Sequence, residues 1–321
     1  MSVFKEEYEV IDSHGHPGFE KKDIEKRPGC LEASWIGEEF ENRVMYDARL
    51  ALGDAEPFKP LTRVDEIPDF SVETWIKSMD QAGVRVHVLQ SLNCLSAPPR
   101  NWRLHVSNEY VKKEFIDKYP DRFVAVGGVN PRDSLEDRIK QVEDAKSKGF
   151  KGIKIHTPTG GYPNDPEKCY PIYERCLELD LHVEIHTGTE GWPGVRLKYM
   201  DPLFIDDIAN DFPKLRILQL HCGSFFNPRI ALWNVMRHKN VFTDITPAHP
   251  TIMQLKYHWD IEHLRVMEYL IPDKVFFGTD FPFVFPHKPS VDHIRKIPLT
   301  AEFKKKLLRE NAIRFYRLDG K

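Results

Sequence analysis

The chain has 321 residues, of which 41% are hydrophobic and 30% are charged, so it can form a large core and is neither disordered nor collagen-like. Its 46 basic and 49 acidic residues give a net charge of −3 and are interspersed, which argues against nucleic acid as a partner. The amino-terminal segment lacks the apolar stretch of a signal peptide, and no apolar run reaches about 18 residues. We therefore expect a cytoplasmic protein that does not bind membranes.

The cysteines number five, an odd count, and no two of them form a C-x-x-C pair. This pattern favours neither a disulfide framework nor a zinc ribbon, and we expect reduced thiols. The positions are Cys30, Cys94, Cys169, Cys176 and Cys222.

Short β-branched runs alternate with longer amphipathic stretches along the chain. The runs predict strands over residues 8–12, 84–90, 123–129, 152–156, 181–186, 215–221, 241–245 and 275–280. The amphipathic stretches predict helices over residues 72–82, 107–119, 135–148, 171–179, 202–211, 228–238, 252–270 and 301–316. Eight such alternations predict an α/β protein with a parallel (β/α)₈ TIM barrel as a single domain over residues 1–321. A doubly wound sheet is less favoured, because no glycine-rich phosphate loop follows the first strand.

Residues 17–70 interrupt this rhythm with prolines and mixed charges and show no clear helix. We interpret them as an insertion over one mouth of the barrel. Substrate specificity is expected to depend on this insertion and on the other loops.

The first predicted strand runs into the sequence I-D-S-H-G-H at residues 11–16. The alternation of a strand predicts that Asp12, His14 and His16 point to one side, with about 6 to 7 Å between alternate Cα atoms. Two imidazoles at that spacing are able to share one metal ion.

Three more strand runs end on polar side chains, at His186, His221 and Asp280. The carboxyl ends of barrel strands meet at one mouth, so these residues are expected to surround a common point. His14, His16, His186 and Asp280 form the predicted shell of one divalent transition metal, zinc or alternatively manganese, with a position left for water or substrate. His221 and Asp280 are the predicted catalytic residues, and the imidazole of His221 is suited to moving a proton at neutral pH.

Loops that follow the ligand-bearing strands supply the predicted substrate contacts. Arg196 is expected to grip a substrate carboxylate, and Trp192 and Phe283 to stack on a planar substrate. Cys222 is adjacent to His221 but has the opposite parity, so a thiol nucleophile is not expected.

The ordered set D-x-H-x-H, G-x-K-x-H, V-x-I-H-T-G, L-x-L-H and G-T-D-x-P resembles the amidohydrolase superfamily. Within it, the chain is similar to the branch of aminocarboxymuconate semialdehyde decarboxylase and related aromatic acid decarboxylases. The resemblance covers residues 12–285 and implies a TIM barrel, a homodimer, metal ligation by His14, His16, His186 and Asp280, and proton transfer by His221. Some decarboxylases of this branch begin the motif with Glu-x-His, so their metal does not transfer to this chain.

The resemblance leaves the number of metals and the reaction open. Binuclear members of the superfamily bridge two metals with a carbamylated lysine on the fourth strand, where this chain has Lys154. The first expectation is decarboxylation of a small aromatic or unsaturated acid by one metal ion. The alternatives are hydrolysis of a lactone, amide or similar carbonyl, and a metal-binding barrel without catalysis.

Overall fold

The computed structural model describes residues 8–17, 71–94, 105–188, 196–224, 227–246, 261–282 and 287–318. Within these ranges, eight parallel strands form one sheet, and each overlaps a predicted strand. In sheet order they are β1 (Val10–Gly15), β2 (Val84–Gln90), β5 (Phe123–Val129), β6 (Gly152–Ile155), β7 (His182–His186), β8 (Ile217–Leu220), β9 (Val241–Asp244) and β10 (Val275–Phe276). The predicted insertion lies outside the described residues, apart from Pro17.

Backbone hydrogen bonds between β1 and the segment that follows β10 bring the two ends of the sheet together. The amide of Ser13 donates to the carbonyl of Phe277 at 2.9 Å, and the amide of Asp280 donates to the carbonyl of His14 at 2.9 Å. The amide of His16 donates to the carbonyl of Phe281, also at 2.9 Å. The predicted (β/α)₈ barrel is therefore confirmed, and its closure places the first predicted ligand strand beside the last.

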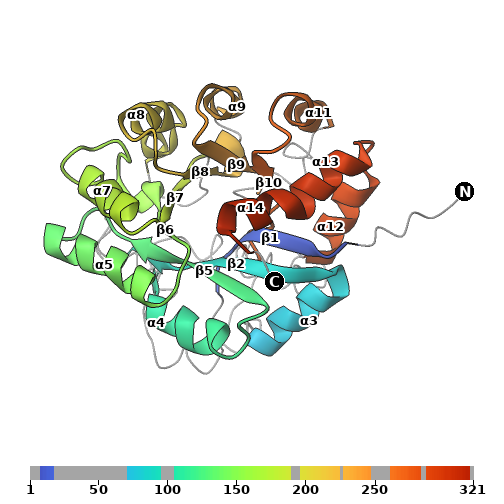
Figure 1. Ribbon diagram of the computed structural model, residues 1–321, viewed down its shortest axis with the longest axis horizontal. Coiled ribbons are helices and arrows are strands. Elements are labelled where there is room, and N and C mark those ends of the chain that lie inside the picture. The colour runs from blue at the N-terminus through green and yellow to red at the C-terminus, as the bar shows by residue number, and fades with distance from the viewer. Residues whose placement is uncertain are drawn as a thin grey trace, which may run out of the picture.

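Helices surround the strands, and Figure 1 shows them as a ring outside the barrel, with α14 lying across the strands. Their bounds are α3 (Val72–Ala82), α4 (Asn108–Val111), a π-helix (Lys112–Ile116), α5 (Leu135–Ser147), α6 (Thr157–Gly160), α7 (Tyr170–Glu178), a 3₁₀ turn (Leu197–Met200), α8 (Leu203–Asp211), a 3₁₀ turn (His221–Gly223), α9 (Pro228–Arg237), α11 (Ile261–Leu270), α12 (His287–Lys296), α13 (Ala301–Lys305), a π-helix (Lys306–Glu310) and α14 (Asn311–Tyr316). None of the described helices is both long and apolar enough to cross a membrane.

Helix α12 and the strand pair β3 and β4 are among the described elements that were not predicted from the sequence. Helix α12 buries only Ser290, Val291, Ile294 and His287, too few apolar side chains to give a clear helical period. The antiparallel pair β3 (Leu92–Asn93) and β4 (His105–Val106) has two residues in each strand, too short for a strand pattern.

Side-chain caps begin several of these helices. Ser71, Ser107, Ser134 and Thr300 each accept a hydrogen bond from a backbone amide three residues later, which satisfies an amide that has no partner within the helix. Gly83 ends α3 with a φ of 71°, a left-handed conformation that glycine adopts without strain. The cap therefore leads directly into β2.

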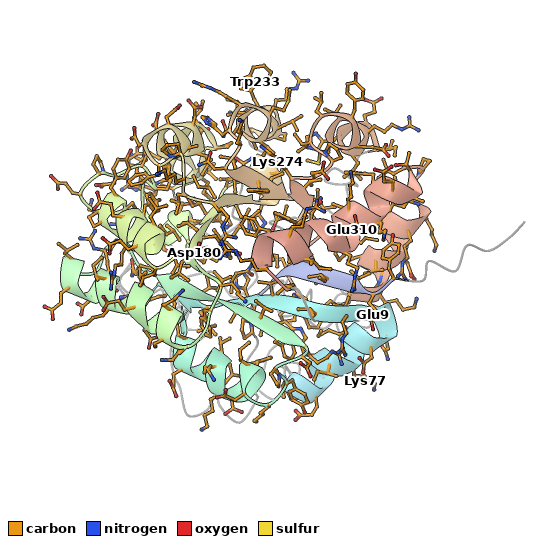
Figure 2. The ribbon with its side chains drawn as sticks, viewed as in Figure 1. Glu9, Lys77, Asp180, Trp233, Lys274 and Glu310 are labelled. Atoms are coloured by element: carbon orange, nitrogen blue, oxygen red, sulfur yellow. The ribbon has the colours of Figure 1, made fainter. Side chains whose placement is uncertain are left out.

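The core lies between the strands and the helix ring, where β-branched and aromatic side chains are almost fully buried. The outer helix faces are exposed; Trp233 on α9, which is 61% exposed, points away from the strands in Figure 2. A second buried cluster inside the barrel includes Phe315 and Tyr316 of α14. This packing fills the barrel interior and leaves the side chains of the predicted site at the strand ends.

Candidate metal centre

Imidazole rings from four different positions gather at the carboxyl ends of β1, β7 and β8. The ring centroids of His14 and His16 are 5.3 Å apart, those of His14 and His221 are 4.7 Å apart, and those of His186 and His221 are 4.5 Å apart. Oδ1 of Asp280 lies 3.6 Å from Nε2 of His14 and 3.3 Å from Nε2 of His16. The structure thus brings the four predicted ligands and His221 into one buried cluster.

The orientation of the two β1 imidazoles is set by partners on the neighbouring strands. Nδ1 of His14 lies 2.9 Å from Oδ2 of Asp244, and Nδ1 of His16 lies 3.2 Å from the backbone carbonyl of Gln90. A carbonyl only accepts hydrogen bonds, so His16 carries its proton on Nδ1, and the carboxylate favours the same tautomer in His14. In both rings the lone pair of Nε2 is consequently directed toward Asp280.

His221 is held in the same tautomer. Its Nδ1 lies 3.1 Å from the backbone carbonyl of Thr246, so Nδ1 donates and Nε2 keeps its lone pair. Its backbone amide donates to Oδ1 of Asp244 at 2.5 Å. Asp244 therefore connects the strand that carries His14 with the residue that was predicted to transfer the proton.

Burial keeps the imidazoles of the predicted metal ligands neutral. Desolvation lowers the pKa of His14 and of His16 well below the ordinary value, and the nearby charge of Lys154 lowers both further. Desolvation also lowers the pKa of His186, with His221 as the next contribution. Neutral imidazoles are the form that binds a metal ion, so this site needs no deprotonation step at neutral pH.

The backbone around the site has positive φ angles at two residues of the predicted site. His221 has a φ of 65° and Asp280 a φ of 58°, both in the left-handed region that residues other than glycine seldom adopt. Gly278 precedes Asp280 by two residues, and a Cβ there would lie 2.1 Å from Oγ1 of Thr246 and 2.9 Å from Cβ of His14. Only glycine allows the turn that carries Asp280 to approach β1 this closely.

The donor set fits a divalent transition metal. Ligand atoms of His14, His221 and Asp280 lie within 4.8 Å of one another, and Nε2 of His16 also faces Asp280. Imidazole nitrogen together with carboxylate oxygen is the ligand chemistry of Zn²⁺ and Mn²⁺ sites. His14, His16 and His221 each have Nδ1 hydrogen-bonded to an acceptor that orients the ring, as metal-binding histidines usually do.

The position of Asp12 differs from the expectation that it points to the same side of the strand as His14 and His16. The strict alternation that would place it beside His14 is wrong, because the pairing of β1 with β2 is irregular between Asp12 and Gly15. Oδ2 of Asp12 instead accepts from Oγ1 of Thr279 at 2.6 Å, and Oδ1 lies 3.5 Å from Nε2 of His87. Asp12 thus holds the segment that leads to Asp280 and does not face the imidazole cluster.

Asp12, His87 and His287 form a second group whose ligand atoms lie within 4.8 Å of one another. Nε1 of Trp75 donates to Nδ1 of His87 at 2.9 Å, and tryptophan can only donate. The neutral ring of His87 therefore carries its proton on Nε2, the atom that faces Asp12, and offers no lone pair there. This second group is a hydrogen-bonded network behind the site and not a metal centre.

We predict that His87 makes the protein less stable in acid. Burial lowers the pKa of His87 from 6.5 to about 3, so between these values the unfolded chain binds a proton that the folded chain does not. The free energy of unfolding should fall as the pH drops below about 6.5, by about 1.4 kcal/mol per pH unit from this residue. Urea unfolding at pH 7 and pH 5 measures the free energy of unfolding at each pH. In the His87→Gln variant, this free energy should depend on pH less steeply than in the wild type, by about 1.4 kcal/mol per pH unit. An unchanged slope would contradict the assignment.

Asp244 and Gln90 are site residues that the sequence reasoning missed. Both end strands, β9 and β2, so the rule applied to His186 and Asp280 could have found them. The side chain of Gln90 accepts from the amide of Gly15 at 3.0 Å and donates to Oε2 of Glu184 at 2.9 Å. These contacts tie the loop of His16 to the barrel interior.

Replacing Asp244 by asparagine should weaken metal binding about 10- to 100-fold. The hydrogen bond between Oδ2 of Asp244 and Nδ1 of His14 orients that imidazole and makes it a stronger ligand. Competition with a chelating dye measures the affinity. Asp292→Asn, at a carboxylate paired with Lys288 on the surface, is the matched control, and equal affinities in both variants would refute the role.

The predicted substrate-binding residues are only partly described. Trp192 and Phe283 lie outside the described residues. Arg196 precedes the 3₁₀ turn Leu197–Met200 and is exposed. Cys222 is buried, and desolvation raises the pKa of its thiol to about 12, which agrees with the expectation that it is not a nucleophile.

Comparison with known proteins finds similar sequences and similar structures. The 2-amino-3-carboxymuconate-6-semialdehyde decarboxylase of Dictyostelium discoideum is 24% identical over 234 residues, and the match spans 64% of this chain and 64% of that relative, just under two thirds. An uncharacterized TIM-barrel protein from Bordetella bronchiseptica is 21% identical with a TM-score of 0.73, and the match covers 98% of this chain and 100% of that one.

A third similar protein has a metal in its structure. The 5-carboxyvanillate decarboxylase of Novosphingobium aromaticivorans, solved with manganese and 4-hydroxy-3-methoxy-5-nitrobenzoic acid, is 18% identical with a TM-score of 0.62, over 98% of this chain and 97% of that one. At these identities the solved structures establish the shared barrel fold. The family model described as Amidohydrolase matches residues 11–318, nearly the whole chain, and the protein therefore belongs to the amidohydrolase family.

Proposed function

We propose that the protein is a metal-dependent decarboxylase of a small aromatic or unsaturated carboxylic acid. The observation that carries this proposal is the convergence of Nε2 of His14 and of His16 on Oδ1 of Asp280, with His221 beside them. The relatives named as decarboxylases, one of them with bound manganese, support this reaction over others in the family.

The proposed metal ligands are His14, His16, His186 and Asp280, and they hold one divalent ion. When bound, such an ion polarises a substrate oxygen and stabilises negative charge that develops next to it. Zinc is the metal predicted from the ligand types, and the manganese of the Novosphingobium relative makes manganese its main competitor. Elemental analysis of protein purified without added metal decides between them.

His221 is the proposed proton donor. Decarboxylation breaks the bond between the carboxylate carbon and the substrate, carbon dioxide leaves, and the electron pair stays on the substrate carbon. Nε2 of His221, whose lone pair its hydrogen bond to Thr246 leaves directed away from the backbone, first takes up a proton from solvent and then delivers that proton to the carbon. The bulk solvent reprotonates the imidazole for the next turnover.

The proposed substrate contacts remain Trp192, Arg196 and Phe283. Of these, Arg196 is proposed to bind the substrate carboxylate. Decarboxylation needs a residue that binds the substrate carboxylate, whereas hydrolysis of a neutral carbonyl does not. Arg196→Leu should therefore strongly impair turnover of an acid. Unchanged turnover would remove Arg196 from the site.

The reaction is tested by measuring carbon dioxide release from a panel of aromatic and muconic acids. The loaded enzyme should release carbon dioxide from at least one acid, and the Asp280→Asn variant and chelator-treated enzyme should not. If the product instead gains oxygen from ¹⁸O-labelled water and no carbon dioxide forms, the protein is a hydrolase and the proposal is wrong.

The domain organisation, the oligomeric state and the location of the protein are also proposals. We propose one barrel domain with residues 17–70 over its mouth, a homodimer, and a cytoplasmic location. Light scattering on the purified protein measures the oligomeric state. Deletion of residues 18–70 should leave a folded barrel with altered substrate preference if the insertion covers the mouth.

A further inference from the structure

Lys154 lies inside the imidazole cluster. It is on β6, where it is only 1% exposed, and its Nζ is 3.3 Å from Nε2 of His14 and 3.1 Å from Nε2 of His16. These are the same two nitrogen atoms that face Oδ1 of Asp280. Lys154 and the proposed metal ion would therefore bind the same lone pairs, those on Nε2 of His14 and of His16.

An ammonium group has three donors and no acceptor, so it hydrogen-bonds to both imidazoles and cannot coordinate a metal. Its positive charge lies where a divalent cation would also be held. Two like charges a few ångströms apart repel strongly, even at the effective dielectric constant of a protein surface, and inside a buried site the repulsion is screened less. A cation at this position should weaken the binding of one metal ion and oppose the binding of a second.

We infer that Lys154 holds a fixed positive charge inside the metal centre. This charge restricts the site to a single divalent ion and lowers the affinity for that ion. This inference rests on the proposed metal centre but not on the reaction, because it concerns metal affinity and stoichiometry. It also gives the buried lysine a role that the ligand set alone leaves unexplained.

The competing role for Lys154 is a carbamate. In that case the neutral amine adds carbon dioxide and releases a proton, and the resulting anion bridges two metal ions. The two roles predict opposite effects of removing the amine. An uncharged side chain should tighten binding of a single ion if Lys154 is a cation, whereas it should abolish binding of at least one ion if Lys154 is a carbamate.

The experiment measures Zn²⁺ and Mn²⁺ affinity by chelator competition, and bound metal by elemental analysis, with and without bicarbonate. Wild-type protein should bind one ion per chain in both conditions, with no added mass of carbon dioxide on the intact chain. Lys154→Met should bind one ion with a dissociation constant at least about tenfold lower. Lys154→Arg, which keeps the charge, should stay near wild type, and Lys140→Met, at an exposed lysine on α5 paired with Glu136, is the matched control.

Several results would overturn the inference. These are unchanged or weaker binding in Lys154→Met, a second ion in wild-type protein when bicarbonate is present, or no metal binding by either protein. If Lys154→Met does not fold, as judged by circular dichroism, Lys154→Gln provides the uncharged variant for the same comparison. Tighter metal binding in a protein that releases no carbon dioxide would uphold this inference and reject only the proposed reaction.

Discussion

Alanine at His14 or at Asp280 is expected to reduce bound metal from about one ion per chain to below about one tenth, and activity with it. The two side chains meet in the cluster, where Nε2 of His14 and Oδ1 of Asp280 are 3.6 Å apart. Losing either leaves too few donors to compensate for the water that an ion gives up on binding. Elemental analysis after dialysis against metal-free buffer measures the change.

Asp273→Ala is the matched control for the aspartate, because Asp273 is exposed and pairs with Lys306 and Arg314 at 3.1 and 3.3 Å. It should keep its metal. Each variant must first show the circular dichroism spectrum of the folded protein. A His14→Ala or Asp280→Ala protein that keeps a full equivalent of metal would contradict the proposed ligand set.

Asparagine at His221 is expected to lower kcat by about 10² to 10⁴ while the bound metal stays near one ion per chain. The amide can still donate to the carbonyl of Thr246, but it cannot carry the proton that Nε2 supplies. Steady-state kinetics on the best acid of the panel measures kcat, and elemental analysis of the same preparation measures the metal.

Cys222→Ala is the control for this variant, because it changes the adjacent residue of the same strained turn without removing a group that transfers protons. Its kcat should stay within a few-fold of wild type. Loss of metal in the His221 variant would make His221 a ligand, which is a real alternative because its ligand atom lies within 4.8 Å of those of His14 and Asp280.

The sequence by itself determined the barrel and the approximate place of the site. All eight strands were predictable because strands buried on both faces are nearly continuous β-branched runs, as in β2 and β5, whose bounds match the prediction. His14, His16, His186 and Asp280 were found together because the carboxyl ends of parallel barrel strands meet at one mouth. That argument needs only the order of strands and the residue at the end of each.

The tertiary structure decided which way these side chains face and what surrounds them. The irregular pairing of β1 turned Asp12 away from His14, and no sequence alternation predicts such a shift. The tautomers of His16 and His221 depend on carbonyl groups of Gln90 and Thr246, distant in the chain. The position of Lys154 between two imidazoles likewise depends on how β6 packs across the barrel from β1, because hydrogen bonds and charge interactions depend on distances that only the folded chain sets.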